Sequence, residues 1–156
     1  MGQVSRRLEE LGLTLPPLLP KLANYVPAKT VGELVFVSGH GPLNPDGSVK
    51  YRGRLGADFT VDDGKEAARL VTMNILSALQ AELGDLDRIR EFVKLLVMVQ
   101  SAPDFQEQHV VAEGASDLLI EVFGPECGSH ARSAVGMMSL PFGIAVEIEA
   151  VVRIAP

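Results

Sequence analysis

The clearest hydrophobic pattern in the chain is the alternation over residues 145–154. One set of alternating positions is wholly apolar and comprises Val146, Ile148, Ala150, Val152 and Ile154. The other set comprises Ala145, Glu147, Glu149, Val151 and Arg153. A period of two with one apolar face predicts a half-buried strand. Its charged face is free to line a site or to meet a partner chain.

A further strand is expected directly before this one, starting after the Gly-Ser-His loop that ends at His130. A short Pro-Gly connection joins the two strands. This order would place Arg132 and Glu147 on adjacent strands, about 4.8 Å apart if the strands pair. Glu149 would share the face of Glu147.

Two apolar runs predict strands inside the sheet. Residues 34–38 and residues 92–99 are almost continuously apolar, which is typical of central strands that are covered on both faces. Val31-Gly32-Glu33 predicts a hairpin turn before the first run. Because residues 34–38 are apolar on both sides, we expect the second face of the sheet to pack on other subunits.

Helical spacing appears in two longer segments. Thr60 and Asp63 can form a capping box, apolar residues then recur at helical intervals, and Gly84 supplies a stop. Residues 104–123 repeat the helical pattern and are followed by Gly124-Pro125. The order β-β-α-β-α-β-β predicts an α+β fold with two helices packed on one face of the sheet.

The chain is expected to consist of an N-terminal extension, residues 1–21, and one domain, residues 22–156. The extension can begin with a short helix over residues 4–11. Three prolines between residues 16 and 20 then exclude regular helix or a central strand.

Composition narrows the classes of function. The 156 residues are 47% hydrophobic and 22% charged, which fits one globular domain. Basic residues number 14 and acidic residues 20, so the net charge of −6 argues against bulk attraction to nucleic acid or anionic lipid. We expect no membrane span and no signal peptide. A single cysteine, Cys127, excludes an internal disulfide, and the cytoplasm is the expected compartment.

Arg132 and the two carboxylates are the first candidates for chemistry. Arg132 has small neighbours, so its guanidinium could present its fork to a carboxylate or a phosphate. Alternatively, Arg132 is a surface residue that pairs with Glu147 or Glu149. One of these carboxylates could orient or activate water as a general base, or both could belong to a solvated face or an intersubunit ion pair. Tyr25 could supply a hydroxyl to a cleft.

The histidines and the cysteine carry weaker signals. His40, His109 and His130 lack the spacing of metal ligands, so no metal site is expected. His109 is expected near the start of the second helix, facing solvent. Cys127 is expected to be a loop thiol. Neither a nucleophile-elbow motif nor a phosphate-binding glycine loop is present.

Several segments, taken in order, resemble the YjgF/RidA family, also called the L-PSP endoribonuclease family. They are Ala23-Asn24-Tyr25-Val26, residues 35–47, Asp104-Phe105, Ala131-Arg132-Ser133-Ala134-Val135, Leu140-Pro141 and residues 146–150. The resemblance covers about residues 22–155. It implies a chorismate-mutase-like fold in which three subunits form a closed β-barrel core with the helices outside. The sites of such a homotrimer lie in clefts between subunits.

The deaminase branch of the family implies a role for each matching residue. Arg132 would bind the carboxylate of a 2-imino acid, and the backbone N–H of Ala134 would donate to the same group. Glu147 would position the water that attacks the C=N carbon, releasing ammonia and a 2-keto acid. The cleft would also include Tyr25, Ser38, Gly39 and His109. No metal or organic cofactor is implied.

The chain departs from the family pattern at three positions. His109, His40 and Ala134 stand where asparagine, glutamine and cysteine are common, and the N-terminal arm is longer than in short members. These departures indicate a divergent subgroup. Two other functions remain open: a non-catalytic module that binds a small carboxylate metabolite, and an endoribonuclease, against which the net charge and the absence of a suitable histidine pair argue.

Overall fold

The protein is described by a computed structural model that covers residues 2–20 and 23–156. Its strands form one mixed sheet in the order β1-β2-β5-β3-β4. The strands are β1 (Ala28–Val31), β2 (Leu34–His40), β3 (Ile89–Gln100), β4 (Ala131–Met137) and β5 (Val146–Ile154). The helices are α1 (Gln3–Glu10), α2 (Val61–Leu83) and α3 (Gln108–Gly128), with short 3-10 turns η1 (Leu86–Arg88) and η2 (Pro141–Gly143).

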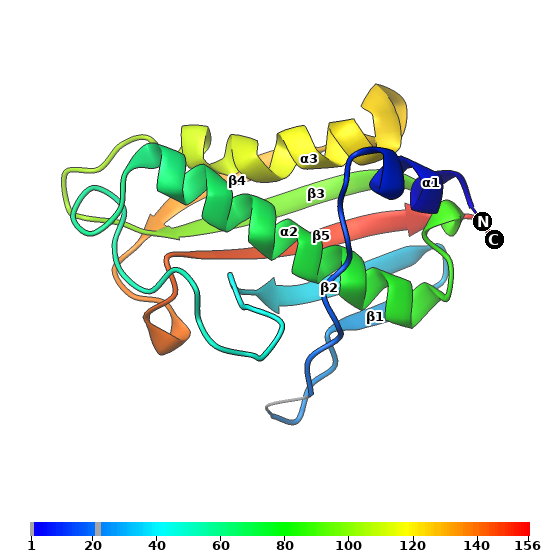
Figure 1. Ribbon diagram of the computed structural model, residues 1–156, viewed down its shortest axis with the longest axis horizontal. Helices are drawn as coiled ribbons and strands as arrows, with labels where there is room; N and C mark the ends of the chain where they lie inside the picture. Colours follow the sequence, from blue (N-terminus) through cyan, green and yellow to red (C-terminus); the bar gives the residue numbers. More distant parts are fainter. Residues whose placement is uncertain (1, 21–22) are drawn as a thin grey trace.

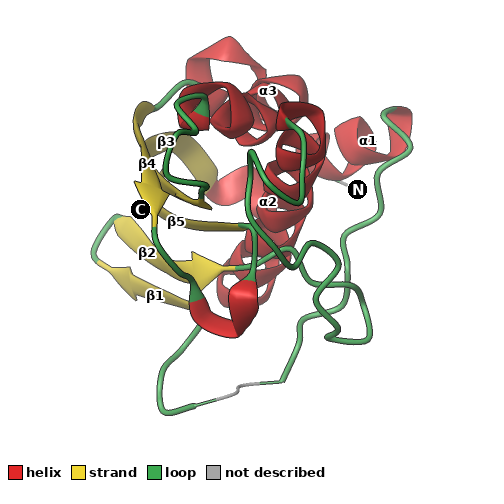
Figure 2. Cartoon of the chain, turned by 90° about the vertical axis from the view of Figure 1, so that its left-hand side faces the viewer, coloured by secondary structure: helices red, strands yellow, loops and turns green. Residues whose placement is uncertain are grey.

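The helices and the sheet form two layers. Helices α2 and α3 lie side by side across one face of the sheet (Figure 1), and the described residues place no helix on the other face (Figure 2). This arrangement confirms the predicted α+β fold with two helices on one face. No helix in the described ranges is long and apolar enough to cross a membrane.

Local signals in the sequence account for the two long helices. The Thr60 side chain accepts from the backbone of Asp63 and the Asp63 side chain accepts from the backbone of Thr60, so the predicted capping box begins α2. Gly84 ends α2 in the left-handed conformation, with φ 76°. Helix α3 begins at Gln108, later than the predicted residue 104, and Gly124 leaves the helical conformation before a last turn.

The hairpin of β1 and β2 confirms the predicted turn, with Gly32 at φ 60°. Strand β2 then pairs antiparallel with β5, and the register shifts between Val37 and His40. The alternation predicted for β5 is confirmed as well, because Val146 and the other apolar alternates are buried while Glu147 and Glu149 are not.

The expectation that the last two strands are neighbours is wrong. Strand β4 pairs in parallel with β3, and β5 pairs antiparallel with β3 and β2, so β3 lies between β4 and β5. The connection from β4 to β5 therefore crosses over β3 instead of forming a hairpin. Arg132 lies opposite Leu95 and Glu147 lies opposite Met98.

The N-terminal segment packs on the domain. Helix α1 buries Val4 and Leu8, and the Asp87 carboxylate accepts hydrogen bonds from the backbone of Gln3 and Val4. The chain then crosses α2 (Figure 1), where the hydroxyl of Ser77 donates to the carbonyl of Pro16 over 2.7 Å. The arm, residues 11–20, thus lies against the helical layer and continues to one end of the sheet.

Candidate functional site

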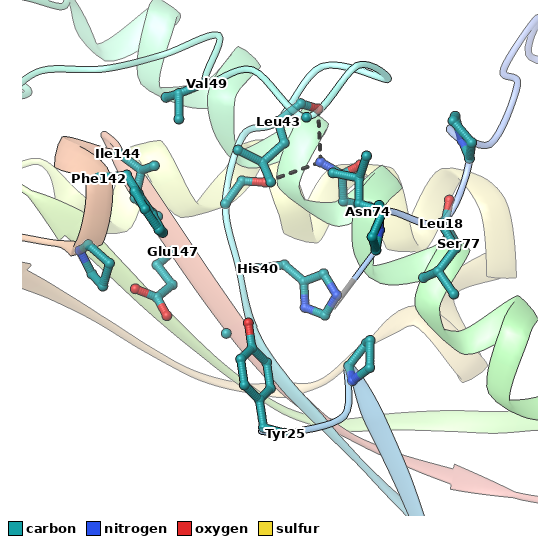
Figure 3. Close-up of a pocket in the computed structure, with 18 residues that line it drawn as sticks. Leu18, Tyr25, His40, Leu43, Val49, Asn74, Ser77, Phe142, Ile144 and Glu147 are labelled. Atoms are coloured by element: carbon teal, nitrogen blue, oxygen red, sulfur yellow. Dashed lines mark hydrogen bonds between the residues drawn. The ribbon is translucent and has the colours of Figure 1, made fainter. Parts of the chain in front are cut away.

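A cavity of about 400 Å³ lies where the arm meets the end of β2. Its walls come from Pro17–Pro20 of the arm, from Gly39–Gly41, from Asn74 and Ser77 of α2, and from the turn around η2. Tyr25 and Glu147 also line it (Figure 3). Four segments that are distant in the sequence therefore meet at one concave surface, which is where ligand sites are usually found.

Glu147 lies directly against Gly39 in this cavity. A Cβ atom at residue 39 would overlap the Glu147 carboxylate, so only glycine leaves this space free. Gly39 lies within the register shift between Val37 and His40. The close approach thus occurs at an irregularity in β2 and not where the strands pair regularly.

The carboxyl group of Glu147 has an altered proton affinity. Burial raises its pKa, and the neighbouring negative charge of Glu149 raises it further. Within the described part of the chain, no donor forms a hydrogen bond with this carboxylate. A half-buried carboxylate with a raised pKa is a stronger base than an ordinary carboxylate and can accept a proton from water.

Tyr25 and Ser38 have different roles around the cavity. Tyr25 is half exposed, and its hydroxyl points toward the space beside Glu147 (Figure 3). The Ser38 hydroxyl instead donates to the carbonyl of Val26 over 2.7 Å, and the Ser38 N–H donates to the carbonyl of Pro27. Ser38 therefore holds the segment that carries Tyr25.

His40 is a cavity residue that the sequence pattern did not place in the site. Its Nδ1 lies 2.6 Å from the carbonyl oxygen of Ser38. A carbonyl only accepts, so Nδ1 carries the proton and Nε2 of the neutral ring is an acceptor. Burial lowers the pKa of His40, which favours this neutral form. The one sign of this role in the sequence is that a histidine stands at residue 40, where glutamine is common in the family.

Phe142 forms an exposed part of the cavity rim in an unusual conformation. It is the one non-glycine residue with a positive φ, 58°, among those described, and such a backbone is costly for an aromatic residue. Gln100 holds the turn, because its Oε1 accepts from the N–H of Leu140 over 2.8 Å and its Nε2 donates to the carbonyl of Gly53. The sequence pattern indicated only a Pro-Gly connection here.

Arg132 lies apart from this cavity. Its Nη1 donates to Glu113 over 2.8 Å and to the Ser116 hydroxyl over 3.0 Å, and its Nη2 donates to the carbonyl of His109. The alternative that Arg132 pairs with Glu147 or Glu149 is therefore wrong within one chain, because its side chain faces α3.

The sheet geometry explains this separation. Arg132 and Leu95 share the face that is covered by the helices, whereas Glu147 and Met98 share the opposite face. Two strand spacings and three residues along β4 place the Cα atoms of Arg132 and Glu147 roughly 14 Å apart. One chain does not bring the two side chains together.

A chain of hydrogen bonds fixes the Arg132 side chain. Nδ1 of His130 lies 2.7 Å from the carbonyl of Gly128, so His130 donates there and its Nε2 accepts from the Ser116 hydroxyl at 2.9 Å. The Ser116 oxygen is then free to accept from Arg132. Ser116 is buried, so this arrangement limits the positions of the guanidinium.

The remaining predicted residues lie near Arg132. Ala134 is two residues further along β4. His109 is exposed in the first turn of α3, as predicted, and contributes its carbonyl oxygen. Within the described ranges, no three side chains of histidine, cysteine, aspartate or glutamate form a group that could hold a metal ion. The predicted site residues thus form two groups, one at the cavity and one around Arg132.

Comparison with known proteins extends these observations. Protein TCP17 of Trypanosoma cruzi is 48% identical over 98% of this chain and 95% of its own length. The crystal structure of Atu1372 from Agrobacterium tumefaciens, a protein of unknown function, is 46% identical over 98% of this chain and 93% of that chain, with a TM-score of 0.90. E. coli TdcF, crystallised with bound serine, shares the fold at 22% identity over 90% of this chain and 94% of that chain, with a TM-score of 0.61.

A family described as "YjgF/chorismate mutase-like, putative endoribonuclease" matches residues 5–147. The match includes the arm, the cavity and Arg132, and it confirms the resemblance inferred from the sequence segments. The five-stranded sheet with its helices on one face is accordingly a YjgF/chorismate mutase-like fold. The chain belongs to the YjgF/chorismate mutase-like family.

Proposed function

We propose that this protein is a hydrolytic deaminase of 2-imino acids that acts in clefts between the subunits of a homotrimer. The observation that carries the proposal is the position of Glu147. Its carboxylate lies free at the Gly39 backbone, beside Tyr25, and its pKa is raised by burial. The residue that the family resemblance assigns to water activation is thus the one with the chemistry of a general base.

The separation of Arg132 from Glu147 supports a site that is shared between copies of the chain. An imino acid is too small to reach both side chains across roughly 14 Å and through the sheet. The face of the sheet that carries Glu147 also exposes Val31 at 57%, Phe36 at 48% and Val135 at 40%. Exposed apolar side chains on one sheet face favour packing against other subunits, which can bring Arg132 of a neighbouring copy to Glu147.

The Arg132 guanidinium and the free edge of β4 supply the hydrogen-bond donors for substrate binding. The guanidinium retains N–H groups, Nε among them, that are not used in its bonds to Glu113, Ser116 and His109. Strand β4 is an edge strand, so backbone N–H groups on its free side have no strand partner within the chain. These donors can bind a carboxylate, and the serine bound to the relative TdcF is a small carboxylate.

The proposed reaction adds water across the C=N bond. Glu147 accepts a proton from the water as its oxygen bonds to the imine carbon, and the proton passes to the nitrogen. The proton of the added hydroxyl group then moves to the nitrogen as the C–N bond breaks, so that the carbon becomes a ketone and the nitrogen leaves as ammonia. One imino acid and one water therefore give one 2-keto acid and one ammonia.

The Arg132→Ala variant tests the proposal. It should lose hydrolysis of 2-imino acids that a partner enzyme generates in situ, while light scattering still reports a trimer. Turnover equal to that of the unmodified protein would refute the role of Arg132. Ammonia release is measured against the spontaneous rate, because free imines also hydrolyse without a catalyst.

The same preparation separates the two other candidate functions. Binding of 2-keto acids without turnover of any imine would favour a metabolite-binding module. Cleavage of RNA by rigorously purified protein, lost on substitution of Glu147, would favour the ribonuclease activity that the family description mentions. The net charge of −6 makes weak RNA binding the expected result.

A further inference from the structure

The cavity extends beyond the residues that the proposed reaction uses, and the N-terminal arm forms its far wall. Pro17, Leu18, Leu19 and Pro20 line this wall. The arm is attached through α1, which buries Val4 and Leu8, and through the bond from Ser77 to Pro16, directly before this wall. Its prolines reduce the conformational freedom that is lost when the wall forms.

The walls of this extension are mainly hydrocarbon. Leu18, Leu43, Val49 and Ile144 contribute aliphatic side chains, and the Phe142 ring lies at the rim (Figure 3). Phe142 is held there by a turn with a costly backbone conformation. Such strain commonly marks a residue whose position matters for binding.

Polar groups in the walls are mostly engaged with the protein. The Asn74 amide donates to the carbonyls of Gly41 and Leu43, both over 3.1 Å. The Ser77 hydroxyl donates to Pro16. His40 is held neutral by burial, and neither lysine nor arginine is among the described residues that line the cavity. A carboxylate buried here would lack a cationic partner, which is costly, whereas an apolar group needs no such partner.

We infer that this cavity binds the hydrocarbon side chain of the substrate, so that the protein acts on 2-imino acids with branched or aromatic side chains. The inference rests on the proposed function for the location of the reacting carbon beside Glu147. With the reacting carbon beside Glu147, a substituent on that carbon can be buried in the part of the cavity that the arm lines. The carboxylate would remain outside, at the donors of a neighbouring Arg132.

The size of the cavity agrees with a large substituent. Its volume of about 400 Å³ equals the share of about thirteen liquid waters, at roughly 30 Å³ each. An imino acid with only a methyl substituent has six non-hydrogen atoms and would leave much of this space to water. Each methylene group buried in place of that water should improve binding by about fourfold.

Calorimetric titration with four 2-keto acids tests this inference. The probes are pyruvate, 2-oxobutanoate, 4-methyl-2-oxopentanoate and phenylpyruvate, used with the full-length protein. 4-Methyl-2-oxopentanoate should bind at least tenfold more tightly than pyruvate. Leu18→Ser should reduce this ratio severalfold, because Leu18 is half exposed and its replacement leaves the fold intact. Thr14→Ala, an exposed arm position outside the cavity, should keep the ratio.

Hydrolysis of the corresponding imines separates this inference from the proposed function. Hydrolysis with equal binding of all four keto acids would overturn the side-chain pocket and leave the deaminase proposal standing. A tenfold binding preference without hydrolysis of any imine would overturn the deaminase proposal and support the pocket. Absence of binding by every keto acid, or an unchanged ratio in Leu18→Ser, would also overturn the pocket.

Discussion

The carboxylate of Glu147 lies on the backbone of Gly39, in space that the Cβ atom of any other residue would occupy. Glu147 belongs to β5 and Gly39 to β2, where the strand register shifts. The absence of a side chain at Gly39 on β2 therefore sets the position of Glu147, the candidate base, on the neighbouring strand β5.

Gly39→Ala tests this relationship. The added methyl group would displace the Glu147 carboxylate, so kcat/KM for imine hydrolysis should fall at least tenfold while the melting temperature changes little. Misplacement of a general base by a short distance is sufficient for such a loss.

Gly84→Ala is the matched control for Gly39→Ala. Gly84 has φ 76° at the end of α2 and nothing within 4 Å of an added Cβ, so its replacement should cost about 1 kcal/mol of stability and leave the reaction rate unchanged. A Gly39→Ala protein with full activity would show that the position of Glu147 is not critical.

The pH dependence should report the interaction between Glu147 and Glu149. The base acts when it is deprotonated, so kcat/KM should rise with pH through the pKa of Glu147. The charge of Glu149 raises that pKa, and Glu149→Gln should therefore move the acid limb of the profile to lower pH. An unchanged limb in this variant would mean that another group controls the rate.

Glu147→Gln is the control for this assignment. It should lower kcat by about 100-fold or more and still bind 2-keto acids. Since the folded pKa of Glu147 lies above its unfolded value, this group destabilises the fold as pH rises through that interval. Glu147→Gln should consequently melt at a higher temperature than the unmodified protein at pH 7.

Mixed trimers should reveal whether the cleft is shared between subunits. Arg132→Ala and Glu147→Gln chains are each expected to be inactive alone. If Arg132 of one chain serves Glu147 of the next, co-expression in equal amounts restores about one quarter of the sites, because both intact residues must meet at one interface. Hydrolysis by the purified mixture is compared with that of each variant.

Absence of any restored activity, in trimers shown by mass spectrometry to be mixed, would contradict a shared cleft. If either variant alone kept its activity, the residue replaced in that variant would not be required for hydrolysis. The experiment therefore tests the assembly and the site together.

His40 should make the stability sensitive to acid. Burial lowers its folded pKa below the ordinary 6.5, so the stability it contributes is present above that value and is lost as the pH falls toward the folded pKa. His40→Gln should lose less stability than the unmodified protein between pH 7 and pH 5, measured by denaturant unfolding. An identical loss in both proteins would show that His40 does not titrate in this interval.

Local patterns in the sequence predicted the elements and part of the site. The capping box at Thr60, the alternation that leaves Glu147 off the buried face and the hairpin at Gly32 depend on residues within a few positions of each other. Tyr25, Gly39 and Glu147 do meet at one cavity. His40 was not predicted there, because a lone histidine at the end of a strand carries no periodic signal.

The chain by itself thus determined which segments become helices and strands and which side of each strand is apolar, because short-range sterics and hydrophobic burial depend on neighbouring residues. Only the tertiary structure decided which strands pair. It inserted β3 between β4 and β5, turned Arg132 toward Glu113 on α3, and laid the arm over the cavity beside Glu147. Strand order and long-range contacts follow from packing of the whole core, which no local pattern of residues encodes.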